Sequence, residues 1–296
     1  METSDAPRSI AEAIARAREE LVRSGIAADE ASLDARLLAQ HALGWDTATL
    51  LSQNHTPFPQ EQASRFDAAV ARRARREPHA YITGEREFWG LPFLVTPDVL
   101  IPRPETELLV EQTLKRCTNA SRTVRVLDLC TGSGAVAVAL AVEHPAIHVV
   151  ATDISLAAIA VARQNAVRHK VQDRITFVCG DLASPVSGRF DTIVANPPYV
   201  PDSDRRGLQP EVRDYEPDLA LFAGSDGLDI IRRILDAAPR LLERGGHLLI
   251  EHGQGQHDAI AGLISPQGLL TMEASVGDLR QIPRVAIFAL REHDRV

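Results

Sequence analysis

The sequence lacks any long uninterrupted apolar run, although apolar residues make up 45% of its 296 residues. A helix that crosses a membrane needs about 20 consecutive, mostly apolar residues, so no such helix is expected. The N-terminal segment METSDAPRSI has neither the basic nor the apolar region of a signal peptide. We therefore expect a cytoplasmic protein with no membrane contact.

Cysteine is scarce, with only Cys117, Cys130 and Cys179. They are widely spaced and form no C-x-x-C pair, so neither a disulfide framework nor a cysteine-based zinc site is expected. His252 and His257 lack an evident third ligand. The sequence thus predicts reduced thiols and no bound metal.

Basic residues are fewer than acidic ones: the sequence has 32 Lys and Arg residues and 40 Asp and Glu residues, for a net charge of -8. Stable binding of nucleic acid relies on many Lys and Arg contacts to phosphates, so it is not expected. One basic cluster comprises Arg72, Arg73, Arg75 and Arg76. We interpret it as a solvated helix end rather than an RNA contact.

The pattern of residue types along the sequence changes near residue 80. Before this point, apolar residues recur at helical spacing and strand signals are missing. From Tyr81, aromatic and β-branched residues alternate with Gly and Pro, as in a hairpin. The predicted domains are a small all-helical domain over 1–80, a connecting hairpin linker over 81–104 and a larger domain over 105–296.

The larger domain repeats a pattern of strand followed by helix. This pattern predicts an α/β fold with a mostly parallel, Rossmann-like sheet, covered on both faces by helices. Ligands of such sheets bind at the carboxyl ends of the strands. The expected parallel strands are 124–130, 148–153, 175–181, 190–196 and 247–253.

Asp128 ends the first of these strands, and Gly132 and Gly134 follow in a turn that opens a helix. Such glycines allow a ligand to approach the backbone, while the helix N-terminus offers free N–H groups. Asp153 closes the second strand, where a carboxylate can accept bonds from ribose hydroxyls. Asp181, after the third strand, is placed to accept a hydrogen bond from an adenine amino group. Together they predict an adenine nucleoside cofactor, although the turn alone also fits a dinucleotide such as NAD.

The fourth strand ends in the unusual run Asn196, Pro197, Pro198, Tyr199. The Asn196 side chain and the Pro197 carbonyl can both accept hydrogen bonds, and the prolines hold them rigidly. Tyr199 offers a flat face for stacking. This arrangement suits a planar NH2 group whose nitrogen attacks an electrophile. The electrophile that fits an adenosine site is S-adenosylmethionine, whereas NAD has no evident use for the two acceptors.

These residues carry a family resemblance. DLCTGSGA, VVATD and FDTIVANPPYV together resemble the class I S-adenosylmethionine-dependent methyltransferases that modify planar NH2 nitrogens. Further segments resemble the protein-(glutamine-N5) methyltransferases of the PrmC/HemK family, which methylate the GGQ glutamine of peptide chain release factors. These segments are VLIPRPETELLVE, YEPDLALFAGSDGLDIIRRIL, GGHLLIEHGQGQ and the N-terminal helices.

The resemblance implies a class I methyltransferase sheet and helices that dock a release factor. It implies catalytic roles for Asn196, Pro197 and Tyr199, and substrate contacts from Asn196 to Tyr199. Arg103 and Glu105 would lie near the mouth of the site, although a structural role at a junction between hairpin and helix is equally open. Glu251 carries the same ambiguity. The implied cofactor contacts are Asp128, Cys130, Thr131, Gly132, Ser133, Gly134, Asp153, Asp181, Leu182 and Asn196.

Two features depart from the family pattern. Cys130 stands where the family commonly has glycine, as in the sister enzymes that methylate a ribosomal protein. The run DLRQIPR (278–284) lacks the glycine of the usual DLAGRDR-like sequence. Both departures concern the identity of the protein substrate more than the chemistry.

Three alternatives stay open at this stage. A glutamine methyltransferase acting on a ribosomal protein would share the chemistry, but RPETELL and YEPDLALF favour the release-factor branch. A DNA adenine methyltransferase would need a basic groove, which the acidic charge balance disfavours. A cofactor-binding helper without turnover is possible because fold alone never proves function, but the intact NPPY run counts against it.

Overall fold

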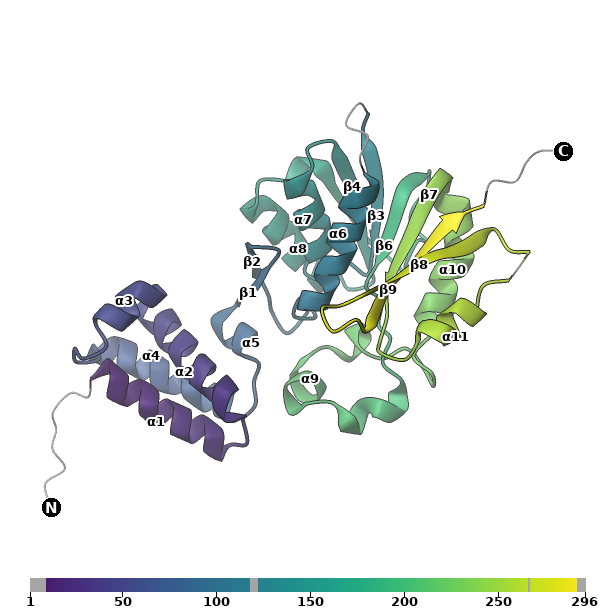
Figure 1. The fold of residues 1–296 in the computed structure, drawn as a ribbon. Helices are drawn as coiled ribbons and strands as arrows, with labels where there is room; N and C mark the ends of the chain where they lie inside the picture. Colours follow the sequence, from purple (N-terminus) through teal and green to yellow (C-terminus); the bar gives the residue numbers. More distant parts are fainter. Residues whose placement is uncertain (1–8, 118–121, 266, 292–296) are drawn as a thin grey trace, which may run out of the picture. The chain divides into compact units, whose positions relative to one another are not determined.

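The computed structural model describes residues 9–117, 122–265 and 267–291 (Figure 1). Its contacts divide the chain into two compact units. One comprises Met1–Gly84 with Gln209–Tyr215, and the other comprises Glu85–Leu208 with Glu216–Val296. Among the described residues, no helix has the length and apolar character needed to cross a bilayer.

The first unit is helical, and its helix ends are encoded locally. Ser9 and Glu12 form a capping box, in which each side chain accepts the other's backbone N–H. Gly44 ends the second helix in the left-handed conformation, with φ at 68°. The helices of this unit are α1 (Ile10–Arg23), α2 (Ala28–Leu43), α3 (Thr47–Ser52), α4 (Gln60–Ala74), α5 (His79–Thr83) and α9 (Pro210–Tyr215).

An apolar core joins α1, α2 and α4. It includes the fully buried side chains of Ile10, Leu21 and Leu38. The rings of Phe58 and Phe66 stack with centroids 5.3 Å apart. Burying a large apolar side chain contributes about 1.5–3 kcal/mol relative to exposing it, so this small unit has a core of its own.

Arg73, near the end of α4, is buried with only 1% of its surface exposed. Its guanidinium donates to Asp34 at 2.6 Å, Glu30 at 2.7 Å and Glu211 at 2.8 Å. Arg76 donates to the other Glu211 oxygen at 2.7 Å. The interpretation of the basic cluster as a solvated helix end is therefore wrong for Arg73, because carboxylates replace water around it.

The segment Gln209–Tyr215 groups with the helical unit although it lies far from that unit in sequence. Glu211 contributes the two ion pairs described above, and the Tyr215 hydroxyl donates to the Arg75 carbonyl at 2.7 Å. Nothing in the sequence indicated this grouping. The chain consequently passes between the two units three times, after Gly84, after Leu208 and after Tyr215.

The second unit is built on a seven-stranded sheet with the order β5-β4-β3-β6-β7-β9-β8. The strands from β5 to β7 run parallel, and β9 and β8 pair antiparallel at the other edge. The predicted α/β, mostly parallel sheet is thus confirmed. The strands are β3 (Val124–Leu129), β4 (Ile147–Asp153), β5 (Ile175–Cys179), β6 (Phe190–Ala195), β7 (Leu242–Glu251), β8 (Leu270–Gly277) and β9 (Pro283–Leu290).

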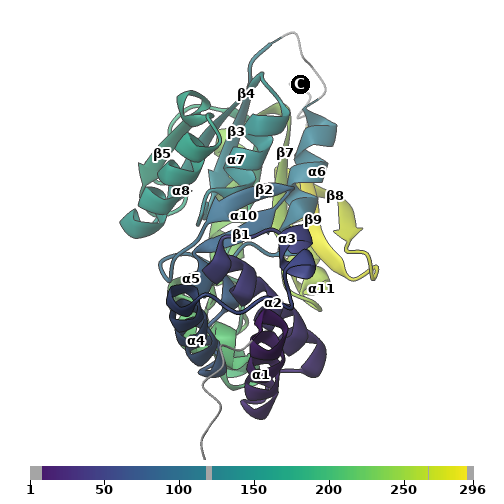
Figure 2. The same cartoon turned by 90° about the vertical axis from the view of Figure 1, so that its left-hand side faces the viewer.

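Helices cover both faces of this sheet (Figures 1 and 2). One face carries α6 (Glu107–Arg116), α7 (Ala135–Glu143) and α8 (Leu156–Arg168), and the other carries α10 (Asp229–Leu241) and α11 (His257–Gly262). Short 3-10 helices lie in the connections: η1 (Pro104–Thr106), η2 (Gln172–Arg174), η3 (Asp202–Gly207) and η4 (Asp218–Ala220).

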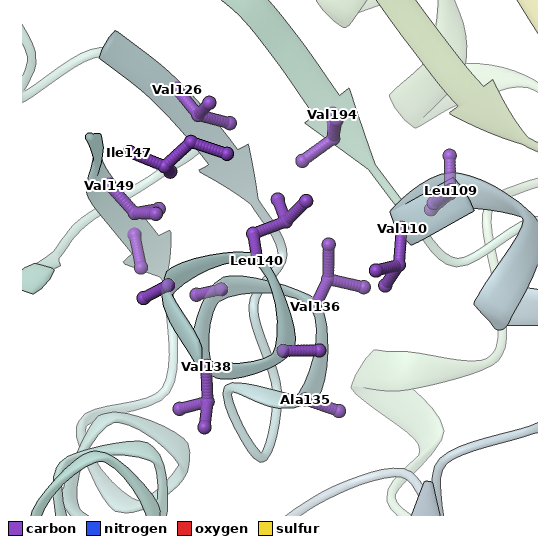
Figure 3. Packing of buried hydrophobic residues seen from close by; sticks show 14 of the residues in the cluster. Leu109, Val110, Val126, Ala135, Val136, Val138, Leu140, Ile147, Val149 and Val194 are labelled. Carbon is purple, nitrogen blue, oxygen red and sulfur yellow. The ribbon is translucent and has the colours of Figure 1, made fainter. Parts of the chain in front are cut away.

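The strand residues alternate between two cores, as a period of two requires. Val126 of β3 packs in the core under α6 and α7, whereas Leu127 packs in the core under α10. Figure 3 shows Val126 and Val194 of the sheet facing Val136 and Leu140 of α7. The central strands are therefore buried on both faces, and their carboxyl ends are held rigidly.

A hairpin precedes the sheet in sequence. Its turn consists of Trp89 and Gly90, with φ at 56° and 68°, which is the pattern of a type I′ turn. The strand pairing occupies only part of the predicted linker 81–104, because α5 extends to Thr83 and no strand follows Leu94 before η1. The two strands are β1 (Glu85–Phe88) and β2 (Leu91–Leu94).

Candidate functional site

A cavity of about 350 Å³ lies in the second unit at the carboxyl ends of β3, β4 and β6. The order of the strands reverses at β3, and this reversal leaves a crevice in parallel sheets. Small-ligand sites typically have roughly 300–1,000 Å³. The predicted site residues that line this cavity are Asp128, Cys130, Thr131, Gly132, Ser133, Asp153, Asp181, Leu182, Asn196 and Pro198.

The glycine turn after β3 is shaped by close packing. Gly134 has φ at 78°, and a side-chain carbon there would lie 3.0 Å from Cβ of Ala162 on α8. The buried Asn165 of α8 donates to the Ser133 carbonyl at 2.9 Å and accepts the Leu94 N–H at 2.7 Å. Gly134 itself is outside the cavity lining. Glycine at this position lets the turn approach α8, and its predicted contact with a cofactor stays a prediction.

Asp153 is oriented by the turn that it faces. One carboxylate oxygen accepts the Gly132 N–H and the other accepts the Ser155 N–H, both at 2.9 Å. Burial raises the pKa of Asp153, whereas these backbone donors lower it. Each oxygen of a carboxylate has a second lone pair. Asp153 can therefore still accept two hydroxyl groups from a ligand in the cavity.

Asp128 stabilises the same turn through a hydrogen bond with Thr131. Its carboxylate accepts the Thr131 hydroxyl at 2.7 Å, and burial raises the pKa of Asp128 to about 7. Asp128 is 2% exposed, so its contact with a ligand is confined to the small part that reaches the cavity. The geometry gives it a clear structural role in the turn.

The two departures from the family pattern share a backbone feature. Cys130 has φ at 59° and Gln281 has φ at 61°. Glycine adopts such angles freely, whereas a residue with Cβ pays about 1–2 kcal/mol there. Gln281 stands where the usual sequence has its glycine. Burial raises the pKa of the Cys130 thiol, so this side chain faces the site uncharged.

Asp181 lies two residues beyond β5 and lines the cavity. It forms an ion pair with Arg233 of α10 at 2.5 Å, and both side chains are about half exposed. Arg233 also lines the cavity. The sequence did not mark Arg233, because a single arginine on an amphipathic helix looks like any surface residue. Leu182 follows with φ at 48°, which turns the chain sharply there.

Asn196 follows β6 directly, and its amide nitrogen Nδ2 donates to the Thr106 hydroxyl at 3.1 Å. Among the described residues, its oxygen Oδ1 has no hydrogen-bond partner, so it can accept from a ligand. The Tyr199 hydroxyl donates to Glu251 Oε1 at 3.4 Å. The side chains at both ends of the NPPY run are therefore held by residues outside it.

The backbone of this run is also fixed. The Tyr199 carbonyl accepts from Gln256 Nε2 at 2.9 Å, and a side-chain carbon on Gly227 would lie only 2.2 Å from that carbonyl. Pro197 is buried, whereas Pro198 lines the cavity. Pro197 and Tyr199 are absent from the cavity lining, so their predicted contacts with a substrate stay predictions.

Arg103 and Glu105 also lie outside the cavity lining. Arg103 pairs with Glu216 at 2.5 Å, and the Glu216 carboxylate also accepts the Ile101 N–H at 3.4 Å. Burial raises the pKa of Glu216, whereas Arg103 lowers it. Arg103 thus has a structural partner, and its role at the mouth of the site stays a prediction, as does that of Glu105.

Two connecting segments line the cavity although the sequence gave them no specific role. One precedes η1 and the other contains η4. Both lack a regular hydrophobic period, and the only signal was their place inside the family-like runs VLIPRPETE and YEPDLALF. The lining residues from these segments are Asp98, Val99, Leu100, Pro102, Pro217, Leu219, Ala220 and Phe222.

Comparison with known proteins gives two matching family models. The PrmC N-terminal domain matches residues 12–84, and the methyltransferase small domain matches residues 104–208. A release factor glutamine methyltransferase of Cereibacter sphaeroides is 47% identical, over 88% of this chain and 91% of that protein. One from Geobacter sulfurreducens is 47% identical, over 81% of this chain and 83% of that protein.

A solved methyltransferase from Pyrococcus furiosus has a similar fold, with a TM-score of 0.51 and 19% identity. The match covers 74% of this chain and 98% of that one. At this identity the likeness concerns the fold alone.

Proposed function

Since the chain belongs to the family of release factor glutamine methyltransferases, we propose that it transfers a methyl group from S-adenosylmethionine to the GGQ glutamine of peptide chain release factors. The acceptor atom is the side-chain amide nitrogen, N5. One observation carries the proposal: the cavity is lined both by Asp153, a carboxylate suited to a ribose, and by Asn196, an acceptor suited to an amide.

The described residues fit S-adenosylmethionine. Asp153 keeps free lone pairs and would hold the two ribose hydroxyls. One Asp181 oxygen is engaged by Arg233, and the other would accept the adenine amino group. The turn from Cys130 to Ser133 brings backbone against the cavity and would contact the amino-acid part of the cofactor.

The chemistry of the proposed reaction follows from the acceptor. When bound, S-adenosylmethionine supplies an electrophilic methyl group on a sulfonium. An amide nitrogen is a weak nucleophile because its lone pair is delocalised. Asn196 Oδ1 and the Pro197 carbonyl would accept its two hydrogens, which aims the lone pair and stabilises the positive charge that develops on nitrogen. No strong general base is needed, since the proton can leave after transfer.

A methyl-transfer assay tests this function directly. Labelled S-adenosylmethionine is offered with purified release factor, ribosomal protein or duplex DNA, and the product is mapped by mass spectrometry. We expect label on the GGQ glutamine and none on a release factor in which that glutamine is replaced by alanine. Label on a ribosomal-protein glutamine would keep the chemistry and overturn the proposed substrate, whereas label on DNA would overturn both.

Replacing Asp153 with alanine is expected to weaken binding of S-adenosylmethionine. Two hydrogen bonds to a charged acceptor are lost, at about 1.5–3 kcal/mol each, which corresponds to about 100- to 10,000-fold in affinity. Titration calorimetry measures the change. The matched control is Asp173→Ala, since Asp173 is exposed on η2 and outside the cavity. Undiminished affinity of Asp153→Ala would contradict the assignment of this carboxylate.

A further inference from the structure

Two buried residues outside the NPPY run hold its ends. Thr106, the last residue of η1, is 4% exposed, and its hydroxyl accepts the Asn196 Nδ2–H at 3.1 Å. Glu251, at the end of β7, is 2% exposed, and its carboxyl accepts the Tyr199 hydroxyl at 3.4 Å. The two come from distant segments of the chain, and Thr106 lines the cavity together with Asn196.

The direction of these bonds decides which end of the Asn196 amide faces the cavity. A threonine hydroxyl can both donate and accept, so Thr106 by itself tolerates either orientation of the amide. The Thr106 hydroxyl, however, also interacts with Glu251 and lowers the pKa of this carboxyl, as a hydroxyl that donates to a carboxylate does. The Glu251 oxygen Oε2 is buried and has no hydrogen-bond partner that meets geometric criteria among the described residues. We assign the Thr106 hydrogen to it, so that the Thr106 oxygen accepts from Asn196. Asn196 must then turn its NH2 toward Thr106 and its oxygen toward the cavity.

This orientation matters for an amide acceptor. If the Asn196 amide were reversed, its NH2 would face the NH2 of the substrate glutamine, and two donors cannot pair. We propose that Thr106 and Glu251 are positioning residues, which keep the oxygen of Asn196 directed at the acceptor nitrogen. This proposal rests on the proposed function. Tyr199 bonds the same carboxyl, which would hold it in a fixed position relative to Asn196.

The proposed orientation depends on the charge of Glu251. Burial raises the pKa of Glu251 to about 7, and the negative charge of Glu105 also raises it. The hydroxyls of Thr106 and Tyr199 and the positive charge of Arg284 lower this pKa, but by less than burial raises it. Above this pH the carboxylate accepts the Thr106 hydrogen, and below it the protonated group holds that hydrogen less firmly. The rate of methyl transfer should therefore fall as the pH drops through about 7, and Glu251→Gln should abolish this dependence.

The test compares three variants of the full chain in single-turnover methyl transfer to release factor. Thr106→Val keeps the shape and loses the hydroxyl, and we expect its rate to fall about 10- to 100-fold, as for a misplaced catalytic group. Thr106→Ser restores the hydroxyl and should recover most of that loss. Thr113→Val is the matched control, because Thr113 is a buried threonine of α6 outside the cavity lining whose hydroxyl bonds the Leu109 carbonyl.

A double substitution separates positioning from simple loss of structure. If Thr106 acts through Asn196, then adding Thr106→Val to Asn196→Ala should lower the rate no further, since the two effects are not additive. A full additional loss in the double variant would overturn the proposal, and so would equal rates for Thr106→Val and Thr106→Ser. Failure of the unaltered protein to methylate release factor would instead overturn the proposed function.

Discussion

Replacing Asn196 with alanine is expected to lower the rate of methyl transfer by about 100- to 1,000-fold, which is the usual cost of removing one preorganised hydrogen-bonding group from an active site. The reason is positional. In the proposed function Asn196 Oδ1 would accept from the substrate amide, since Asn196 lines the cavity and its nitrogen is already engaged by Thr106. Binding of S-adenosylmethionine should change by no more than a few-fold, because the ribose and adenine would be held by Asp153 and Asp181.

The measurement pairs single-turnover kinetics with calorimetric titration of the cofactor. Asn196→Asp serves as the comparison, since it keeps an acceptor oxygen of nearly the same shape and should lose less rate than alanine does. Parallel losses of rate and of cofactor affinity in Asn196→Ala would show that the residue shapes the cofactor pocket instead.

Replacing Arg73 with methionine is expected to destabilise the helical unit by about 3–5 kcal/mol, the typical cost of removing one partner from a buried ion pair. The guanidinium serves three carboxylates, and Asp34 and Glu211 are themselves almost buried. Without Arg73 the nearly buried Asp34 would lose the ion pair described above, and Glu211 would keep only its pair with Arg76. Methionine fills much of the same volume, so the lost charge and hydrogen bonds account for the effect.

Hydrogen exchange measured by mass spectrometry over α2 and α4 reads this stability without assuming that the two units unfold together. The control is Arg75→Met, because Arg75 belongs to the same basic run but is exposed. It should cost no more than about 0.5 kcal/mol, as surface substitutions usually do. Equal protection in the two variants would mean that the buried ion pairs contribute nothing net.

The regular part of the fold was readable from the sequence because it rests on local patterns. Apolar runs that alternate with amphipathic helices predicted the parallel sheet, and the change of residue pattern near residue 80 predicted a helical N-terminal region. The start of β7 was predicted at His247, yet the strand begins at Leu242. Leucine, arginine and paired glycines carry no strand signal of their own, and their pairing with Phe190 of β6 decides the matter.

The candidate site was readable only where its residues follow strand ends. Asp153 and Asn196 stand directly at such ends, and the structure brings them to one cavity. Thr106 and Arg233 were missed as members of the site because their partners, Asn196 and Asp181, lie far away in sequence. Buried Arg73 was misread for the same reason, since the sequence shows the charge of a residue but not the carboxylates that will surround it.

The assignment of Gln209–Tyr215 to the helical unit limits how this enzyme can be divided. A truncation that begins at residue 85 would remove Arg73 and Arg75 and leave Glu211 and Tyr215 without the groups they bind. A chimera that exchanges only the first 84 residues would mismatch the same contacts. The helical unit is therefore built from two separate segments of the sequence, and a chimera must take both segments from the same protein.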